Sequence, residues 1–116
     1  MTEAQLEEFR QRLETLRQEL LATREAARES TRPVELDQAS VGRLSRMDAM
    51  QGQAMAIESQ RRREILLQRI QGALHRISTG DYGLCVACEE EIALRRLETD
   101  PAATFCLSCA AHREKR

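Results

Sequence analysis

The four cysteines of this 116-residue chain are the residues best suited to chemistry. They form two Cys-x-x-Cys pairs, Cys85/Cys88 and Cys106/Cys109, with 17 residues between the pairs. Each pair can supply two thiolates from one short turn, and two such turns can surround one Zn²⁺ tetrahedrally at about 2.3 Å. The spacing therefore predicts one structural zinc with all four cysteines as ligands. Zinc would also supply folding free energy to residues 81–116, which are too few to bury a sufficient core alone.

Other uses of the thiols are disfavoured. Met1 is followed by an acidic, polar stretch rather than a leader, and no apolar run approaches the roughly 18 residues of a membrane span, so we expect a cytoplasmic protein. Disulfides are rare in that compartment, and a redox dithiol needs only one pair. A thiol redox sensor remains an alternative. His112 follows Cys109 by three residues, but with four cysteines present we expect it at the surface or beside the site.

Charge argues against DNA binding by the cysteine region. Between the two pairs lie five carboxylates, Glu89, Glu90, Glu91, Glu98 and Asp100. Only two cations, Arg95 and Arg96, accompany them, whereas phosphate contacts need the opposite balance. These arginines could instead offset the charge of a four-thiolate zinc centre, or help in docking. The net charge of −1 likewise favours neither nucleic acid nor a membrane surface.

The segment before the cysteines is typical of two long helices. Apolar residues recur at alternating steps of three and four: Leu6, Phe9, Leu13, Leu16 and Leu20. This seam predicts a first helix over residues 2–30, with Thr2 and Gln5 as a capping box. A composition with 3% aromatic and 32% charged residues fits such thin helical packing.

The predicted second helix begins after a break at Pro33. Asp37 is a plausible N-cap, and the helix should run from Gln38 to about Thr79, where Gly80 ends it. Its expected seam contains Val41, Leu44, Met47, Met50, Ala54 and Ile57, and then Ile65, Leu66, Ile70, Leu74 and Ile77. The second helix exceeds the first, so its end should pack against the cysteine region.

The expected fold is therefore all-α. Residues 1–80 form a long antiparallel coiled-coil hairpin with its tip near residues 31–37. Residues 81–116, which we call the zinc knob, form a small zinc-binding unit that ends in a short C-terminal helix. Neither a nucleophile–base constellation nor a glycine-rich phosphate loop is present in the sequence, so an enzyme is not expected.

Three sequence segments resemble the DksA/TraR family of C4 zinc-finger transcription regulators. They are "DYGLC", "EEIALRRLETDP" and "FCLSC", the last two joined by the loop before the second cysteine pair. The resemblance implies that the chain binds RNA polymerase rather than DNA. It also implies that the hairpin enters the secondary channel, with its tip near the catalytic site, while the zinc knob docks on the rim.

The predicted hairpin tip matches the family pattern only in part. Family tips read Asp-x-x-Asp-x-Ala, and here Asp37 and Ala39 match while Val34 replaces the first Asp. Glu35 is a nearby acid at a different offset. We expect Glu35, Asp37 and Ala39 to act at the tip, with DksA-like effects weakened by the missing acid.

Two further departures concern the zinc knob. Glu89 stands where family members commonly have glycine, so its turn must use an unusual conformation or differ in shape. Asp100 and Ala110 stand where ppGpp-responsive members tend to have basic residues, which implies weak or absent ppGpp dependence. We expect a monomer. A zinc-stabilised helical adaptor, a dimer built on the seam, and a small DNA-binding zinc protein are the alternatives.

Overall fold

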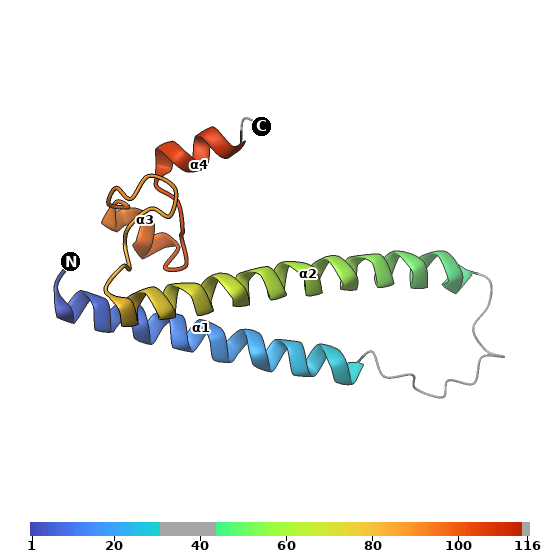
Figure 1. The fold of residues 1–116 in the computed structure, drawn as a ribbon. Helices are drawn as coiled ribbons and strands as arrows, with labels where there is room; N and C mark the ends of the chain where they lie inside the picture. Colours follow the sequence, from blue (N-terminus) through green and yellow to red (C-terminus); the bar gives the residue numbers. More distant parts are fainter. Residues whose placement is uncertain (31–43, 115–116) are drawn as a thin grey trace.

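The structure is a computed structural model that describes residues 1–30 and 44–114, with side chains described for residues 1–29 and 52–114. Within these ranges the chain forms four helices: α1 (Glu3–Ser30), α2 (Leu44–Thr79), α3 (Leu94–Thr99) and α4 (Leu107–Glu114). The long helices α1 and α2 lie side by side and antiparallel, with the zinc knob at one end (Figure 1). The predicted helical hairpin is confirmed.

Both ends of the hairpin base are capped as the sequence predicts. The backbone N–H of Gln5 donates to Thr2 Oγ1 at 3.1 Å, and the N–H of Thr2 donates to Gln5 Oε1 at 2.9 Å. This reciprocal capping box satisfies donors that a helix start leaves unpaired. At the other end, Gly80 adopts φ +83° while the Asp81 N–H donates to the Arg76 carbonyl at 2.9 Å. This Schellman geometry ends α2 where glycine has no steric penalty.

The seam of α1 is confirmed. Phe9 and Leu13 are buried, and Leu6, Leu16 and Leu20 pack partly buried against the same core. Farther along the hairpin, the Arg24 guanidinium on α1 meets the Glu64 carboxylate on α2 at 3.2 Å.

The predicted seam of α2 is only partly right. Ile70 is fully buried and Leu66, Leu74 and Ile77 pack against the core. Ala54, Ile57 and Ile65 are instead exposed, although Ile57 borders a groove that α1 also lines. Leu67 and Ala73 are buried in their place. The predicted seam positions 41, 44, 47 and 50 lie outside the residues whose side chains the structure describes.

The core sits where the zinc knob meets the hairpin. Its buried residues come from α1, α2 and the zinc knob together: Phe9, Leu13, Ile70, Ala73, Tyr82, Cys85, Ile92, Leu97, Ala102 and Ala103. The final part of α2 therefore packs against the cysteine region, as the surplus length of the second helix predicts. A single shared core fixes the zinc knob to the base of the hairpin.

The zinc knob contains one helix that the sequence pattern does not predict. This is α3, which lies between the two cysteine pairs and buries Leu97 completely. The predicted C-terminal helix is α4, which begins directly after Cys106 and projects away from the hairpin (Figure 1). Among the described residues, no helix is both long enough and apolar enough to span a membrane.

Candidate metal centre and its supports

The four cysteines converge in the zinc knob. Their sulfur atoms all lie within 4.8 Å of one another, and the Sγ atoms of Cys88 and Cys106 are 3.7 Å apart. Cys85 is buried, Cys88 is exposed, and Cys106 and Cys109 lie between these extremes. The cluster thus has one side in the core and one side toward solvent.

The cluster geometry fits one zinc ion. Four sulfurs placed tetrahedrally at about 2.3 Å from a metal are about 3.8 Å from one another. The separation of 3.7 Å between Cys88 and Cys106 agrees with this value and exceeds the roughly 2.05 Å of a disulfide. The cluster therefore suits a structural zinc, and its four-sulfur donor set is that of closed structural sites rather than open catalytic ones.

A short turn builds the first half of the site. Leu84 and Glu91 form an isolated antiparallel bridge, and the Cys85 N–H donates to the Glu90 carbonyl at 2.8 Å. These bonds close a loop that brings Cys88 back toward Cys85. Glu89 has φ +63°, the left-handed conformation, and its N–H donates to the Cys85 carbonyl at 2.9 Å. The turn thus keeps the shape that favours glycine, although the residue is glutamate.

The second half of the site is built on α4. Cys106 precedes the helix and Cys109 lies in its first turn, so the helix sets their separation. The Cys109 N–H points to the Cys106 sulfur at 3.4 Å. The Arg96 Nε donates to the Phe105 carbonyl at 2.9 Å, which ties α3 to the residue before Cys106.

The thiols differ in how readily they ionise. Burial opposes ionisation of Cys85, but backbone N–H groups of Cys106, Cys88 and Ala87 outweigh it and lower its pKa to about 6. The thiols of Cys106, Cys88 and Cys85 around Cys109 raise its pKa to about 12. The Cys85 thiol therefore ionises easily, whereas the Cys109 thiol resists ionisation without a cation among the sulfurs.

Hydrogen bonds from Arg12 and Arg69 and a ring contact of Tyr82 join the zinc knob to the hairpin. Arg12 Nη2 on α1 donates to the Glu98 carbonyl at 2.7 Å, and Arg69 Nη2 on α2 donates to Asp100 Oδ2 at 2.9 Å. Both arginines meet the region at the end of α3. The buried Tyr82 hydroxyl donates to the Pro101 carbonyl at 2.8 Å, and its ring centroid is 5.7 Å from that of Phe9 on α1.

The sequence does not indicate the two arginines that join the zinc knob to the hairpin. Arg12 and Arg69 stand among the charged residues of the two predicted helices, where an arginine is normally exposed to solvent. Nothing in their spacing indicates a partner in the zinc knob. Tyr82 carried a clearer sign, because the only tyrosine of the chain directly follows the helix-ending Gly80–Asp81 turn.

The remaining candidate residues lie apart from the sulfurs or outside the described ranges. Arg95 is exposed on α3, and Arg96 acts on the cluster only through the Phe105 carbonyl. His112 is exposed on α4 and is not a member of the metal-ligand cluster found among the described residues. The tip candidates Glu35, Asp37 and Ala39 lie outside the described residues.

Comparison with known proteins gives consistent matches. Residues 80–115 match the prokaryotic dksA/traR C4-type zinc-finger family. The RNA polymerase-binding transcription factor DksA of Caulobacter vibrioides is 32% identical over 117 residues, covering 100% of this chain and 80% of that protein. DksA of Haemophilus influenzae is 35% identical over 63 residues, and this match spans less than half of that protein, 43%.

A solved structure extends the similarity to the whole fold. The transcription factor DksA2 from Pseudomonas aeruginosa superposes with a TM-score of 0.76 and 37% sequence identity. The match covers 100% of this chain and 88% of that chain. The similarity therefore includes both the hairpin and the zinc knob.

Proposed function

This chain belongs to the DksA/TraR family of C4 zinc-finger proteins, and from that membership we propose that it binds RNA polymerase and regulates transcription initiation. The observation that carries the proposal is the similarity over the full chain to RNA polymerase-binding DksA proteins. It includes the hairpin as well as the zinc-finger segment. The relatives are transcription factors, so the proposed role is regulatory rather than enzymatic.

The proposed mechanism uses the hairpin as a probe and the zinc knob as its base. The 28 residues of α1 give an arm of about 42 Å at 1.5 Å per residue. The knob holds the arm through the shared core, through the bonds from Arg12 and Arg69, and through the contact between the Tyr82 and Phe9 rings. A fixed angle between base and arm would let binding at the rim direct the tip into the secondary channel.

The tip would act at the polymerase active site through its acidic side chains. Asp37 and Ala39 match two of the three family tip positions, and Glu35 adds a displaced carboxylate. A carboxylate near the catalytic centre would act electrostatically on the metal ions and phosphates there. The missing first acid predicts a weaker effect than that of fully matching family members.

We assign zinc binding to Cys85, Cys88, Cys106 and Cys109. Bound zinc would supply folding free energy to residues 81–116 and hold α4 against the first cysteine turn. Division of the chain into a hairpin over residues 1–80 and a zinc knob over residues 81–116 belongs to this proposal. A cytoplasmic location follows from the proposed partner.

Weak or absent ppGpp dependence is also part of the proposal. Asp100 presents a carboxylate where responsive members tend to have a cation, and this carboxylate already pairs with Arg69 at 2.9 Å. Ala110 offers no charge at the second such position. A phosphate group would lack two charge-assisted contacts there.

The alternatives of a DNA-binding protein and a seam dimer have less support. Glu89, Glu90, Glu91 and Glu98 are all exposed, so phosphates would meet a negative surface on the zinc knob. The seam residues Phe9 and Leu13 are buried within the chain's own core, which leaves that part of the seam unavailable to a second chain and favours a monomer.

Equilibrium binding to core RNA polymerase tests this proposal. Zinc-loaded protein carrying a fluorophore is titrated with polymerase in the absence of DNA, and DksA of Caulobacter vibrioides is then added as competitor. We expect saturable binding that the competitor displaces. Absence of binding at tens of micromolar, or binding that the competitor leaves unchanged, would contradict the proposed site on the polymerase.

A further inference from the structure

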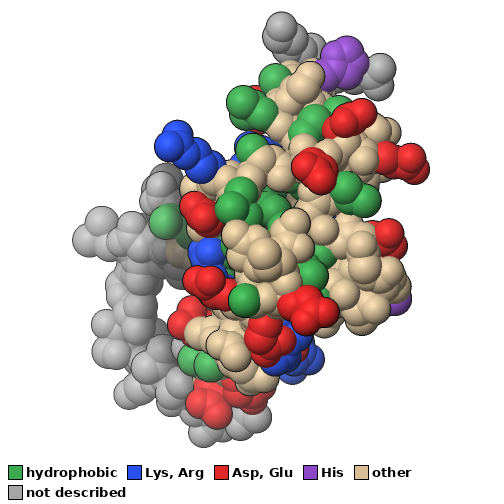
Figure 2. All heavy atoms as spheres, turned by 90° about the vertical axis from the view of Figure 1, so that its left-hand side faces the viewer, with side chains coloured by type: hydrophobic (Ala, Val, Ile, Leu, Met, Phe, Trp, Pro, Cys, Tyr) green, Lys and Arg blue, Asp and Glu red, His purple; other side chains and the backbone are tan. Residues whose placement is uncertain are grey.

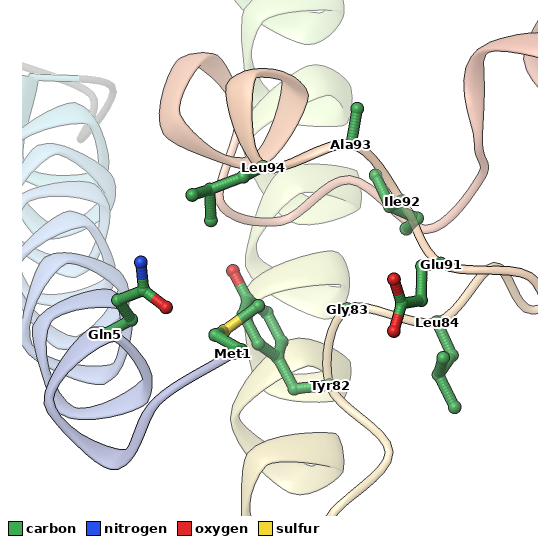
Figure 3. A pocket seen from close by; sticks show the side chains of 9 residues that line it. All are labelled: Met1, Gln5, Tyr82, Gly83, Leu84, Glu91, Ile92, Ala93 and Leu94. Atoms are coloured by element: carbon green, nitrogen blue, oxygen red, sulfur yellow. The ribbon is translucent and has the colours of Figure 1, made fainter.

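A cavity of about 390 Å³ opens between the start of the chain and the zinc knob. Figure 3 shows that Met1 and Gln5 border it from the side of α1, while Tyr82 forms its floor. The opposite wall consists of the segments joined by the Leu84–Glu91 bridge and the residues leading into α3. The lining is Met1, Gln5, Tyr82, Gly83, Leu84, Glu91, Ile92, Ala93 and Leu94.

The mouth of this cavity exposes apolar side chains. Met1 is 53% exposed, Leu94 39% and Leu84 36%, although each is a large aliphatic residue. Ile92 and Tyr82 are buried beneath them. Exposed apolar groups gathered around a hollow, rather than scattered singly, are typical of an interaction site.

The surface around the cavity is acidic. Glu91 is the one lining residue with a charged side chain. Residues 81–100 contain six carboxylates against two arginines, and one of these carboxylates, Asp100, pairs with Arg69 of α2. Figure 2 shows this end of the molecule, where acidic side chains outnumber basic ones and surround the hydrophobic groups.

We propose that this cavity is a docking site for a basic segment of RNA polymerase that inserts one aliphatic side chain beside a Lys or Arg. The inference rests on the proposed function and assigns a contact to it. The aliphatic side chain enters between Met1 and Leu94, and the neighbouring cation meets the Glu91 carboxylate. The surrounding carboxylates raise the rate of encounter with a positive surface.

Charge and shape favour this occupant over two others. A second copy of the chain in a two-fold dimer would place the same acidic rim against itself, which is repulsive. A small ligand is normally buried for most of its surface, whereas this cavity is bordered by leucines that are more than a third exposed and need a larger covering partner. A protein segment satisfies both the apolar rim and the negative charge.

Two variants and two matched controls test the docking site by equilibrium binding to core RNA polymerase. Glu91→Lys reverses the charge at the cavity, and Glu98→Lys makes the same change on the exposed face of α3. Leu94→Ser removes an aliphatic group from the rim, and Ile65→Ser removes one of similar exposure, 43%, from α2. Zinc content and circular dichroism of each variant establish that it is folded.

We expect Glu91→Lys and Leu94→Ser each to weaken binding about tenfold, with each control changing it by less than about threefold. The Glu91→Lys effect should shrink at about 0.5 M salt, while the Leu94→Ser effect persists. If the Leu94→Ser variant loses zinc, the binding of the Glu91→Lys variant to polymerase, compared with that of Glu98→Lys, still tests the docking site.

Two results overturn the proposal in different ways. If the unsubstituted protein binds polymerase and the cavity variants match their controls, the docking site is wrong and the proposed function stands. If the unsubstituted protein fails to bind polymerase, the proposed function fails, and this inference fails with it.

Discussion

Replacement of Leu97 by alanine should weaken the packing of the zinc knob against the hairpin. Leu97 lies on α3, has no exposed surface, and belongs to the core that includes Phe9, Leu13 and Ile70 of the hairpin. Truncation to alanine removes three carbon groups, worth about 2.4 kcal/mol at about 0.8 kcal/mol each. The residual cavity adds about 1 kcal/mol, so the free energy of unfolding should fall by about 3–4 kcal/mol.

This loss should also appear in zinc affinity, because the same core includes the ligand Cys85. If the substitution disrupts the zinc knob locally, 3 kcal/mol corresponds to a loss of roughly 100-fold in apparent affinity. Urea unfolding followed by circular dichroism at 222 nm measures stability, and competition with a zinc chelator measures affinity. Leu94→Ala on the same helix is the control and should cost less than about 1 kcal/mol, since Leu94 is 39% exposed. Equal losses for Leu97→Ala and Leu94→Ala would refute the shared core.

Three further predictions address the buried Tyr82, the turn at Glu89, and the ion pair between Arg69 and Asp100. Burial raises the pKa of Tyr82 to about 12, so absorbance at 295 nm should show the only tyrosine titrating near 12 in the folded protein and near 10 in urea. Because the folded pKa lies above the unfolded one, this contribution to stability is complete below about pH 10 and is lost as the pH rises toward 12; a folded value near 10 would show that the ring is not buried. Glu89→Gly should stabilise the zinc-loaded protein by about 0.5–1 kcal/mol in urea unfolding, whereas Glu89→Ala should not, because only glycine relieves a φ of +63°; equal effects would rule out the left-handed turn. A double-mutant cycle on Arg69 and Asp100 should give a coupling below about 1 kcal/mol, since both side chains are about 40% exposed, and a coupling above about 2 kcal/mol would mean that the pair is shielded from water.

Local rules sufficed to predict the two long helices, the C-terminal helix and the sulfur cluster from sequence, but not α3. The capping box of Thr2 and Gln5 and the Schellman end at Gly80 depend only on residues a few positions apart. Each Cys-x-x-Cys pair is likewise a short-range structure, and the need of zinc for four ligands predicts that the two pairs converge. Such features need no knowledge of distant contacts.

Features that depend on distant contacts could not be predicted in the same way. Ile57 and Leu67 are both aliphatic residues of α2, yet Ile57 is 60% exposed and Leu67 is buried. A helical period gives the spacing of a buried face, but the distant partner determines how much of that face is covered. The hydrogen bond from Arg12 to the Glu98 carbonyl spans 86 positions in the chain, and no local pattern encodes it.

Site-specific photocrosslinking from the tip tests the central claim most directly. Asp37 is replaced by a photoreactive amino acid, the zinc-loaded protein is bound to core RNA polymerase, and the crosslinked polymerase peptides are identified. The account predicts crosslinks to segments that line the secondary channel close to the catalytic site. Crosslinks confined to the outer surface of the polymerase would contradict the channel mechanism, and absence of any crosslink in a complex shown to be saturated would contradict tip insertion.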